Sequence, residues 1–270
     1  MPLDPAEMAA HAATENFPIA SLLFPRALRP HLRAIYGFAR LVDILGDEWE
    51  GDRLEALDEL ERDVERCYTG EPTWPVIQQL QPTIREFDLP PEPFLRLIEA
   101  NRMDQRISEY ETWADVKHYC VHSADPVGRV VLGILRRAGE PQVVAWSDDV
   151  CTGLQLVNFL QDVPRDLELG RVYMPAEDRQ RFGVTVLDRP NEPLRNLMAF
   201  ETGRARGLLA AGEPLGAQLG GRVGRAVALF ARGGLAALDQ LERLDFDVFS
   251  QRPVPPRSRL AWEAVKVAVS

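Results

Sequence analysis

Two segments far apart in the chain each carry a polar stripe inside an apolar helical pattern. The first lies in residues 31–49 with the spacing i, i+4, i+7, i+11: Tyr36, Arg40, Asp43 and Asp47. The second lies in residues 143–167 with the spacing i, i+3, i+7, i+11: Gln155, Asn158, Asp162 and Asp166. Because a helix turns by about 100° per residue, the first four fall within roughly 60° of one another, and the second four also share a face. Both segments are hydrophobic enough to be central, so each would place an Asp-x-x-x-Asp pair near the core.

The carboxylates of the two stripes need a positive partner. Unpaired buried carboxylates would repel one another and would be costly to desolvate. Mg²⁺ prefers hard oxygen ligands and keeps waters or substrate phosphates in its shell, whereas Zn²⁺ is disfavoured because both stripes lack Cys and His. Two or three Mg²⁺ ions would balance the aspartates plus a diphosphate and would help that diphosphate depart. The alternative for either motif alone is a solvated helix face, since the chain has 41 acidic residues.

Composition and charge argue against several classes of protein. The net charge of −10 disfavours a nucleic-acid binder, which would present a basic face. The three cysteines, Cys67, Cys120 and Cys151, have no CxxC spacing, so we interpret them as packing residues in a reducing cytosol. Residues 1–16 lack the apolar core of a signal peptide, and no run approaches the ~18 apolar residues of a membrane span. We therefore expect a cytoplasmic protein whose contact with a membrane, if any, is peripheral.

Helical periodicity punctuated by Pro and Gly predicts an all-α protein. The expected helices span residues 31–49, 53–68, 76–87, 94–108, 113–137, 143–167, 192–219 and 222–244, with a final short helix after Pro256. Residues 170–190 are interpreted as irregular, with one short helical turn. Residues 1–270 are predicted to form a single all-helical domain of the bundle type.

Pro164 lies between the two aspartates of the second stripe. A proline inside a helix removes one backbone hydrogen bond and bends the helix, and here it would free the carbonyl of Leu160. We expect a helix that bends but continues through Asp166. The alternative is a helix that ends at this point, which would weaken the assignment of Asp166 to the shared face.

These segments resemble the two aspartate-rich motifs of the squalene and phytoene synthases. The likeness rests on YGFARLVDILGD at 36–47 and QLVNFLQDVPRD at 155–166. It extends to GRVYMP at 170–175, to Tyr119-Cys120 and to DPVGR at 125–129. Within the family, two further segments are most similar to hydroxysqualene synthases: ENFPIAS at 15–21 and LIEANRMDQRISEYET at 97–112.

The resemblance implies an isoprenoid-synthase-type helical bundle with a central cavity and with the diphosphate between the two motifs. It implies a Mg²⁺-dependent carbon–oxygen lyase of hopanoid-type squalene biosynthesis, which converts presqualene diphosphate and water to hydroxysqualene and diphosphate. No NADPH and no nucleic acid are expected. The partners it implies are the substrate, a separate presqualene diphosphate synthase, a flavin-dependent squalene-forming reductase and the membrane surface.

The chain departs from the family pattern at two places. The first motif of relatives reads Asp-Asp-x-x-Asp, but its second position here is Ile44. The outer aspartates are intact, so metal binding is expected to be kept. Members that condense two prenyl diphosphates often carry Ser and Lys where this chain has residues 14–16. That difference favours a reaction of a single substrate.

The polar candidates are assigned to metal and diphosphate. Four residues are expected as metal ligands: Asp43, Asp47, Asp162 and Asp166. The resemblance adds Asn158, both to the metal ligands and to the substrate-binding residues. Arg40 and Arg171 are candidate diphosphate clamps, since a guanidinium matches phosphate oxygens. Arg171 has the alternative of a surface ion pair with Glu168.

The aromatic candidates are assigned to the substrate's hydrocarbon and cation. Three tyrosines are catalytic candidates because aromatic faces stabilise cations: Tyr36, Tyr119 and Tyr173. Core packing is the alternative, above all for Tyr119. Gln155 is the candidate for orienting the attacking water, and Phe17 is counted as a substrate-binding wall residue.

Two other functions stay open. Within the family, the chain could be a squalene, phytoene or presqualene diphosphate synthase that condenses two prenyl diphosphates. From another class, it could be a catalytically inactive helical scaffold that binds a partner. Retention of all four aspartates argues against the scaffold.

Overall fold

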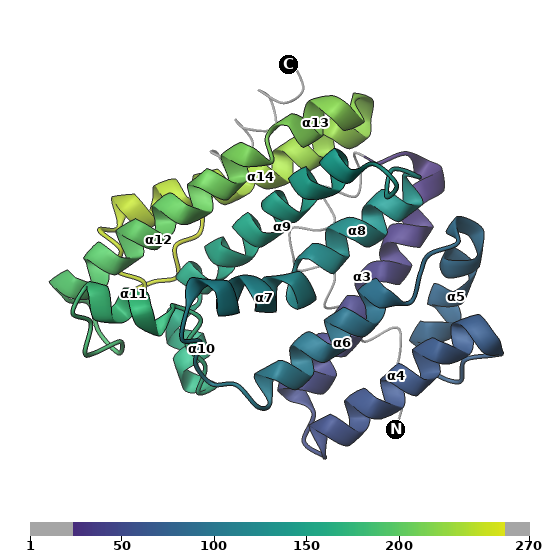
Figure 1. Cartoon of the computed structure of the whole chain (residues 1–270), viewed down its shortest axis with the longest axis horizontal. Helices are drawn as coiled ribbons and strands as arrows, with labels where there is room; N and C mark the ends of the chain where they lie inside the picture. Colours follow the sequence, from purple (N-terminus) through teal and green to yellow (C-terminus); the bar gives the residue numbers. More distant parts are fainter. Residues whose placement is uncertain (1–23, 257–270) are drawn as a thin grey trace. The chain divides into compact units, whose positions relative to one another are not determined.

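The computed structural model describes residues 24–256, which form helices joined by turns and short loops (Figure 1). Their contacts define two compact units. The first unit comprises residues 24–106 and 122–144, and the second comprises residues 107–121 and 145–256. In this described part the only β-type pairing is an isolated bridge between Glu109 and Val172, so the all-α class is confirmed. The single domain stays a prediction.

The helices of the first unit begin at capping residues or prolines. Its elements are η1 (Arg26–Leu28), α3 (Arg29–Asp43), the π-helical turn η2 (Ile44–Glu48), α4 (Arg53–Thr69), α5 (Pro75–Phe87), α6 (Glu92–Asp104) and α8 (Asp125–Ile134). The Asp52 carboxylate accepts a hydrogen bond from the Glu55 N–H at 3.0 Å, which satisfies one of the donors left open at the start of α4. α5, α6 and α8 carry proline in their first turn, where its missing N–H is not needed.

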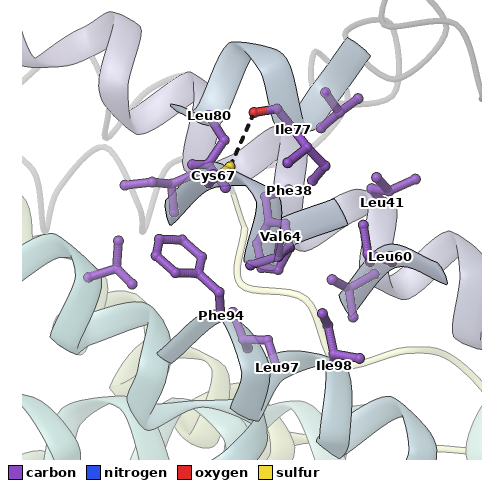
Figure 2. Packing of buried hydrophobic residues seen from close by; sticks show 14 of the residues in the cluster. Phe38, Leu41, Leu60, Val64, Cys67, Ile77, Leu80, Phe94, Leu97 and Ile98 are labelled. Carbon is purple, nitrogen blue, oxygen red and sulfur yellow. Dashed lines mark hydrogen bonds between the residues drawn. The ribbon is translucent and has the colours of Figure 1, made fainter. Parts of the chain in front are cut away.

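The apolar faces of α3, α4, α5 and α6 pack together as the core of the first unit (Figure 2). Phe38 of α3 and Phe94 of α6 are fully buried and meet edge to face, with ring centroids 5.3 Å apart. Buried aliphatic side chains surround them: Leu41, Leu60, Val64, Ile77, Leu80 and Ile98. Burial raises the pKa of the Cys67 thiol to about 11, and this thiol donates to the Ile77 carbonyl at 3.9 Å. Cys67 is therefore a packing residue, as predicted.

The second unit contains most of α7 (Trp113–Ser123) and α9 (Pro141–Gln161). It also contains all of the later helices: α10 (Val163–Glu168), α11 (Ala176–Arg181), α12 (Glu192–Ala211), α13 (Pro214–Leu219) and α14 (Gly221–Arg243). α14 packs against α12 and α13 (Figure 1). It also approaches α9 closely, because a Cβ at Gly234 would lie 2.7 Å from a methyl carbon of Leu154. Among residues 24–256, no helix has the length and apolar content needed to cross a membrane.

Three helices that the sequence predicted as continuous are broken near prolines. Residues 113–137 form α7 and α8, which are separated at Ala124 ahead of Pro126. Residues 192–219 are broken ahead of Pro214, and residues 143–167 are broken ahead of Pro164. Proline lacks the N–H of a continuing helix and restricts the residue before it. The short helix predicted after residue 256, like Phe17, lies outside the described residues.

Candidate active site

The first aspartate pair lies where α3 passes into a wider turn. Asp43 is the last residue of α3 and is exposed, while Asp47 lies in η2 and is half-buried. η2 is closed by a hydrogen bond from the Trp49 N–H to the Ile44 carbonyl at 2.9 Å. The helix predicted to residue 49 is thus observed to Glu48, but its last turn, from Ile44, is π-helical and not α-helical. Turns of this π type are rare and recur at functional sites.

Ile44, the departure from the family's first motif, has a packing role. Its side chain is 9% exposed and belongs to the apolar core of the first unit. A carboxylate at this position would lose its hydration among aliphatic side chains. Ile44 therefore packs in the core, while the outer aspartates Asp43 and Asp47 are exposed and half-buried, respectively.

Tyr36 and Arg40 precede this pair on α3, both half-buried. The Arg40 guanidinium donates to Glu48 Oε1 at 2.7 Å, which ties α3 to the end of η2. Because this pair is partly solvated, it contributes little to stability. Arg40 therefore places a positive charge beside η2, and an anionic ligand could compete with Glu48 for it.

The second aspartate pair spans the junction of two helices. α9 ends at Gln161, and Asp162 has the non-helical backbone angles φ −108° and ψ 13° before α10 begins. Asp166 lies on α10, so the uninterrupted helix predicted through Asp166 is wrong and the alternative of a helix end is the one observed. The Asp166 N–H still donates to the Asp162 carbonyl at 2.9 Å. Asp166 therefore follows Asp162 by one hydrogen-bonded turn, despite the break imposed ahead of Pro164.

Arg252 brings a cation to Asp162. Its Nη2 donates to Asp162 Oδ2 at 2.9 Å, and its Nε donates to Oδ1. The neighbouring Gln161 amide donates to the Pro253 carbonyl, so the segment 248–256 is held at the α9–α10 junction. Two parallel bonds of this kind form one of the stronger side-chain pairings. The sequence predictions missed Arg252 because its partner is 90 residues away and no local spacing signals the pairing.

Gln155 and Asn158 lie on the last turns of α9, as predicted. Gln155 is half-buried and Asn158 is exposed. The Asn158 carbonyl accepts a hydrogen bond from the Asp162 N–H at 2.9 Å. The side-chain amides of Gln155 and Asn158 therefore both lie on the helical segment that leads into Asp162.

Four buried aromatic rings gather in the second unit, and we call them the aromatic cluster: Tyr110, Tyr119, Phe159 and Tyr173. Phe159 and Tyr173 are stacked with centroids 4.0 Å apart, and Tyr119 lies 5.2 Å from Tyr173. The bridge between Glu109 and Val172 sets the following residues, Tyr110 and Tyr173, side by side with centroids 5.9 Å apart. The sequence predictions missed Tyr110, a single aromatic in a polar loop.

The aromatic cluster adjoins a small pocket that contains two of the predicted polar residues. Asp166, Arg171, Phe159 and Tyr173 line this pocket together. Arg171 is only 8% exposed, so the alternative that it is a surface residue is wrong. Its backbone N–H donates to the Asp166 carbonyl at 2.8 Å. The second unit thus brings a carboxylate, a guanidinium and aromatic faces to one place.

A buried ionic cluster lies beside the aromatic cluster, and the sequence predictions missed it. Arg204 donates to both carboxylate oxygens of Glu201 at 2.6 and 2.7 Å and to Asp178 at 3.0 Å. Burial raises the pKa of Glu201 to about 7, with Arg204 opposing the rise and Asp178 adding to it. Glu201 and Tyr173 line a second small pocket that is otherwise mostly apolar. The only sequence signal is the Glu-x-x-Arg spacing within α12.

The donors of the two aspartate pairs are suited to magnesium. The first pair, Asp43 and Asp47, belongs to the first unit, and the second pair, Asp162 and Asp166, belongs to the second unit. Across residues 24–256, no three His, Cys, Asp or Glu side chains gather as a metal site. A Mg²⁺ shell commonly combines one or two carboxylates with water or phosphate oxygens. Mg²⁺ is the ion that retains such ligands. Arg252 occupies the Asp162 carboxylate in this structure, so a metal at this carboxylate would have to displace it.

Comparisons with known proteins place this architecture in a family. The squalene/phytoene synthase family profile matches residues 10–259. A hydroxysqualene synthase from Rhodopseudomonas palustris is 37% identical over 215 residues, which cover 76% of this chain and 71% of the relative. A phytoene synthase from Arthrospira platensis is 32% identical over 264 residues, which cover 90% of this chain and 84% of the relative.

A solved structure agrees with these sequence matches. The crystal structure of squalene synthase HpnC from Alicyclobacillus acidocaldarius has a TM-score of 0.84 and 43% identity, and the match covers 90% of this chain and 93% of that one. The isoprenoid-synthase-type helical fold predicted from the sequence is thus confirmed. The chain belongs to the squalene/phytoene synthase family, whose members are isoprenoid synthases that act on prenyl diphosphates.

Proposed function

We propose that this chain is a hydroxysqualene synthase, which converts presqualene diphosphate and water to hydroxysqualene and diphosphate. The observation that carries the proposal is the likeness to the hydroxysqualene synthase of Rhodopseudomonas palustris, at 37% identity. Both aspartate pairs are retained, which supports an active enzyme over an inactive scaffold.

The polar residues act on the diphosphate end of the substrate. Asp43 and Asp47 in the first unit, and Asp162 and Asp166 in the second, would hold the Mg²⁺ ions. Bound Mg²⁺ supplies charge neutralisation for the diphosphate as its carbon–oxygen bond breaks. Arg171 adds a fixed positive charge beside Asp166, and its guanidinium matches the spacing of phosphate oxygens.

The aromatic cluster acts on the cation that remains. Tyr119, Phe159 and Tyr173 present electron-rich faces to a carbocation. Their burial also keeps bulk water away, so that the cation can rearrange before it is captured. A single ordered water held by polar groups then adds to the cation. The new carbon–oxygen bond forms from the water oxygen, and the water releases one proton.

Gln155 remains our candidate for holding that water. It is half-buried on α9 and precedes Asn158 and Asp162 on the same hydrogen-bonded segment. Its amide can both donate to and accept from a water molecule. Replacing Gln155 by Leu should redirect products toward dehydrated or rearranged alcohols while diphosphate release continues.

The metal assignment is tested by conservative substitutions that remove one charge. Asp43→Asn and Asp162→Asn should each lower Mg²⁺-dependent diphosphate release by at least ~100-fold, as loss of a charge-stabilising group does. Asp188→Asn, in an exposed loop, is the matched control and should turn over normally. Near-normal turnover of both active-site variants, with folding intact by circular dichroism, would rule out the metal assignment.

A second candidate is condensation of two prenyl diphosphates, as in phytoene synthesis. It is favoured by the match to the Arthrospira platensis phytoene synthase, which covers 90% of this chain. This candidate predicts product from farnesyl or geranylgeranyl diphosphate alone.

Hydroxysqualene formation should need no nicotinamide, so a squalene product that forms only with NADPH would contradict the proposed function.

A further inference from the structure

The turn that carries Asp47 ends a helix and leaves backbone acceptors open. η2 ends at Glu48, and Trp49 is extended with φ −67° and ψ 127°. In a longer helix the carbonyls of Gly46 and Asp47 would accept hydrogen bonds from the following turn. Because the helix stops, these carbonyls must find donors elsewhere.

Two side chains, one at the end of α6 and one at the start of α4, supply those donors. Gln105, directly after α6, donates from Nε2 to the Gly46 carbonyl at 2.9 Å and to the Asn101 carbonyl at 3.1 Å. Arg53, the first residue of α4, donates from Nη2 to the Asp47 carbonyl at 2.9 Å and from Nε to the Trp49 carbonyl at 3.1 Å. Both therefore act on the backbone of η2.

Packing against α6 fixes the same turn from the side. Gly46 is buried, and a Cβ added there would lie 2.0 Å from Asn101 Oδ1. Only glycine lets the backbone of η2 approach α6 this closely. The approach brings the Gly46 carbonyl within reach of Gln105, so the glycine and the glutamine depend on each other.

We infer that Gln105 and Arg53 are positioning residues that hold Asp47 in the π-helical turn, in the direction in which it binds metal with Asp43. This inference rests on the proposed function. Without the two donors, η2 can tighten toward ordinary i→i+4 bonding, and Asp47 then points in a different direction relative to Asp43. Groups that orient metal ligands from behind commonly set metal affinity in this way.

The test measures Mg²⁺ binding by calorimetry on the full chain without substrate, and then the Mg²⁺ concentration for half-maximal diphosphate release. Gln105→Leu and Arg53→Met should each weaken Mg²⁺ binding by roughly 10-fold to 100-fold. Arg53→Lys keeps one donor and should recover part of that loss. The maximal rate at saturating Mg²⁺ should change less than the Mg²⁺ requirement.

Gln81→Leu is the matched control. The Gln81 amide also donates to two backbone carbonyls of the first unit, those of Gly70 at 2.9 Å and Cys67 at 3.3 Å, where α4 ends. Its loss should lower thermal stability but leave Mg²⁺ binding unchanged. Equal Mg²⁺ affinities in Gln81→Leu and Gln105→Leu would therefore overturn the inference, and if Gln105→Leu fails to fold, Arg53→Met and Arg53→Lys decide.

Asp47→Asn separates this inference from the proposed function. If Asp47→Asn loses Mg²⁺ binding while the Gln105 and Arg53 variants bind like the wild type, the inference is wrong and the metal assignment stands. If Asp47→Asn itself binds Mg²⁺ normally, the metal assignment of the first pair fails.

Discussion

Asp63 has no exposed surface, yet its carboxylate is fully supplied with donors. Oδ1 accepts from Arg66 at 2.7 Å and from both the N–H and the hydroxyl of Thr73 at 2.8 Å, while Oδ2 accepts from the Trp74 N–H at 2.8 Å. Burial alone would raise the pKa of Asp63, but these hydrogen bonds outweigh it and lower the pKa below its ordinary value. The charged side chain thereby ties the loop before α5 to α4.

Replacing Asp63 by Asn should destabilise the protein by roughly 2–3 kcal/mol. The amide NH₂ of Asn cannot accept a hydrogen bond, so it would face at least one of the donors that now bond to the carboxylate. Urea denaturation at pH 7 measures this. Asp58→Asn, which breaks an exposed ion pair with Arg102, is the control and should cost under about 1 kcal/mol. The Asp63 contribution should disappear on acidification, since a depressed pKa gives stability that is lost as pH falls through the folded-state value. A variant as stable as the wild type would contradict this role.

Glu201 has the opposite pH dependence. Its folded-state pKa of about 7 lies above the ordinary value of 4.5, so the folded protein keeps a proton that the unfolded chain loses. The free energy of unfolding should therefore fall as pH rises from about 4.5 to about 7, by up to roughly 1.4 kcal/mol per pH unit from this group. Glu201→Gln should flatten that part of the profile, measured by denaturant melts across the range. An identical slope in both proteins would show that Arg204 keeps Glu201 ionised.

At the scale of elements, helices with a clear apolar face were predicted closely, whether or not a side chain caps their start. The segments 53–68 and 222–244 match α4 and α14 to within one residue at each end. The breaks near Pro126, Pro164 and Pro214 were harder to predict because proline can bend a helix or end it, and the outcome depends on the preceding residue. The π-helical turn could not be predicted from local sequence, because Gly46 in this turn contacts Asn101 and Gln105, which lie far from it in the sequence.

On the proposed metal assignment, the segment 248–256 would compete with Mg²⁺ for Asp162. Arg252 neutralises Asp162 through two hydrogen bonds, and Mg²⁺ must displace it to use that carboxylate. In the substrate-free protein, Arg252→Gln should therefore raise Mg²⁺ affinity by up to about tenfold, the value of one charge-assisted hydrogen bond. Calorimetry measures this, with Arg195→Gln, which breaks an exposed pair with Asp245, as the control. Unchanged affinity would mean that Arg252 does not oppose metal binding.

At the scale of the whole molecule, the sequence was most informative where residues of one chemical kind recur at helical spacing. Two Asp-x-x-x-Asp stripes predicted carboxylate pairs, and the family match supports the reading of them as parts of a prenyl diphosphate enzyme. The rest of the site was not predictable in the same way. Tyr110, Glu201 and Arg252 owe their positions to contacts between distant segments, and aromatic or charged residues of these types occur throughout the chain.

The most direct measurement is a product analysis of the purified protein with presqualene diphosphate and Mg²⁺ in ¹⁸O-water, without NADPH. A parallel reaction contains farnesyl diphosphate alone. The account predicts ¹⁸O-labelled hydroxysqualene and diphosphate from the first reaction and no hydrocarbon product from the second. Hydroxysqualene without the label would contradict water capture of the cation, and condensation of farnesyl diphosphate without turnover of presqualene diphosphate would contradict the proposed function itself.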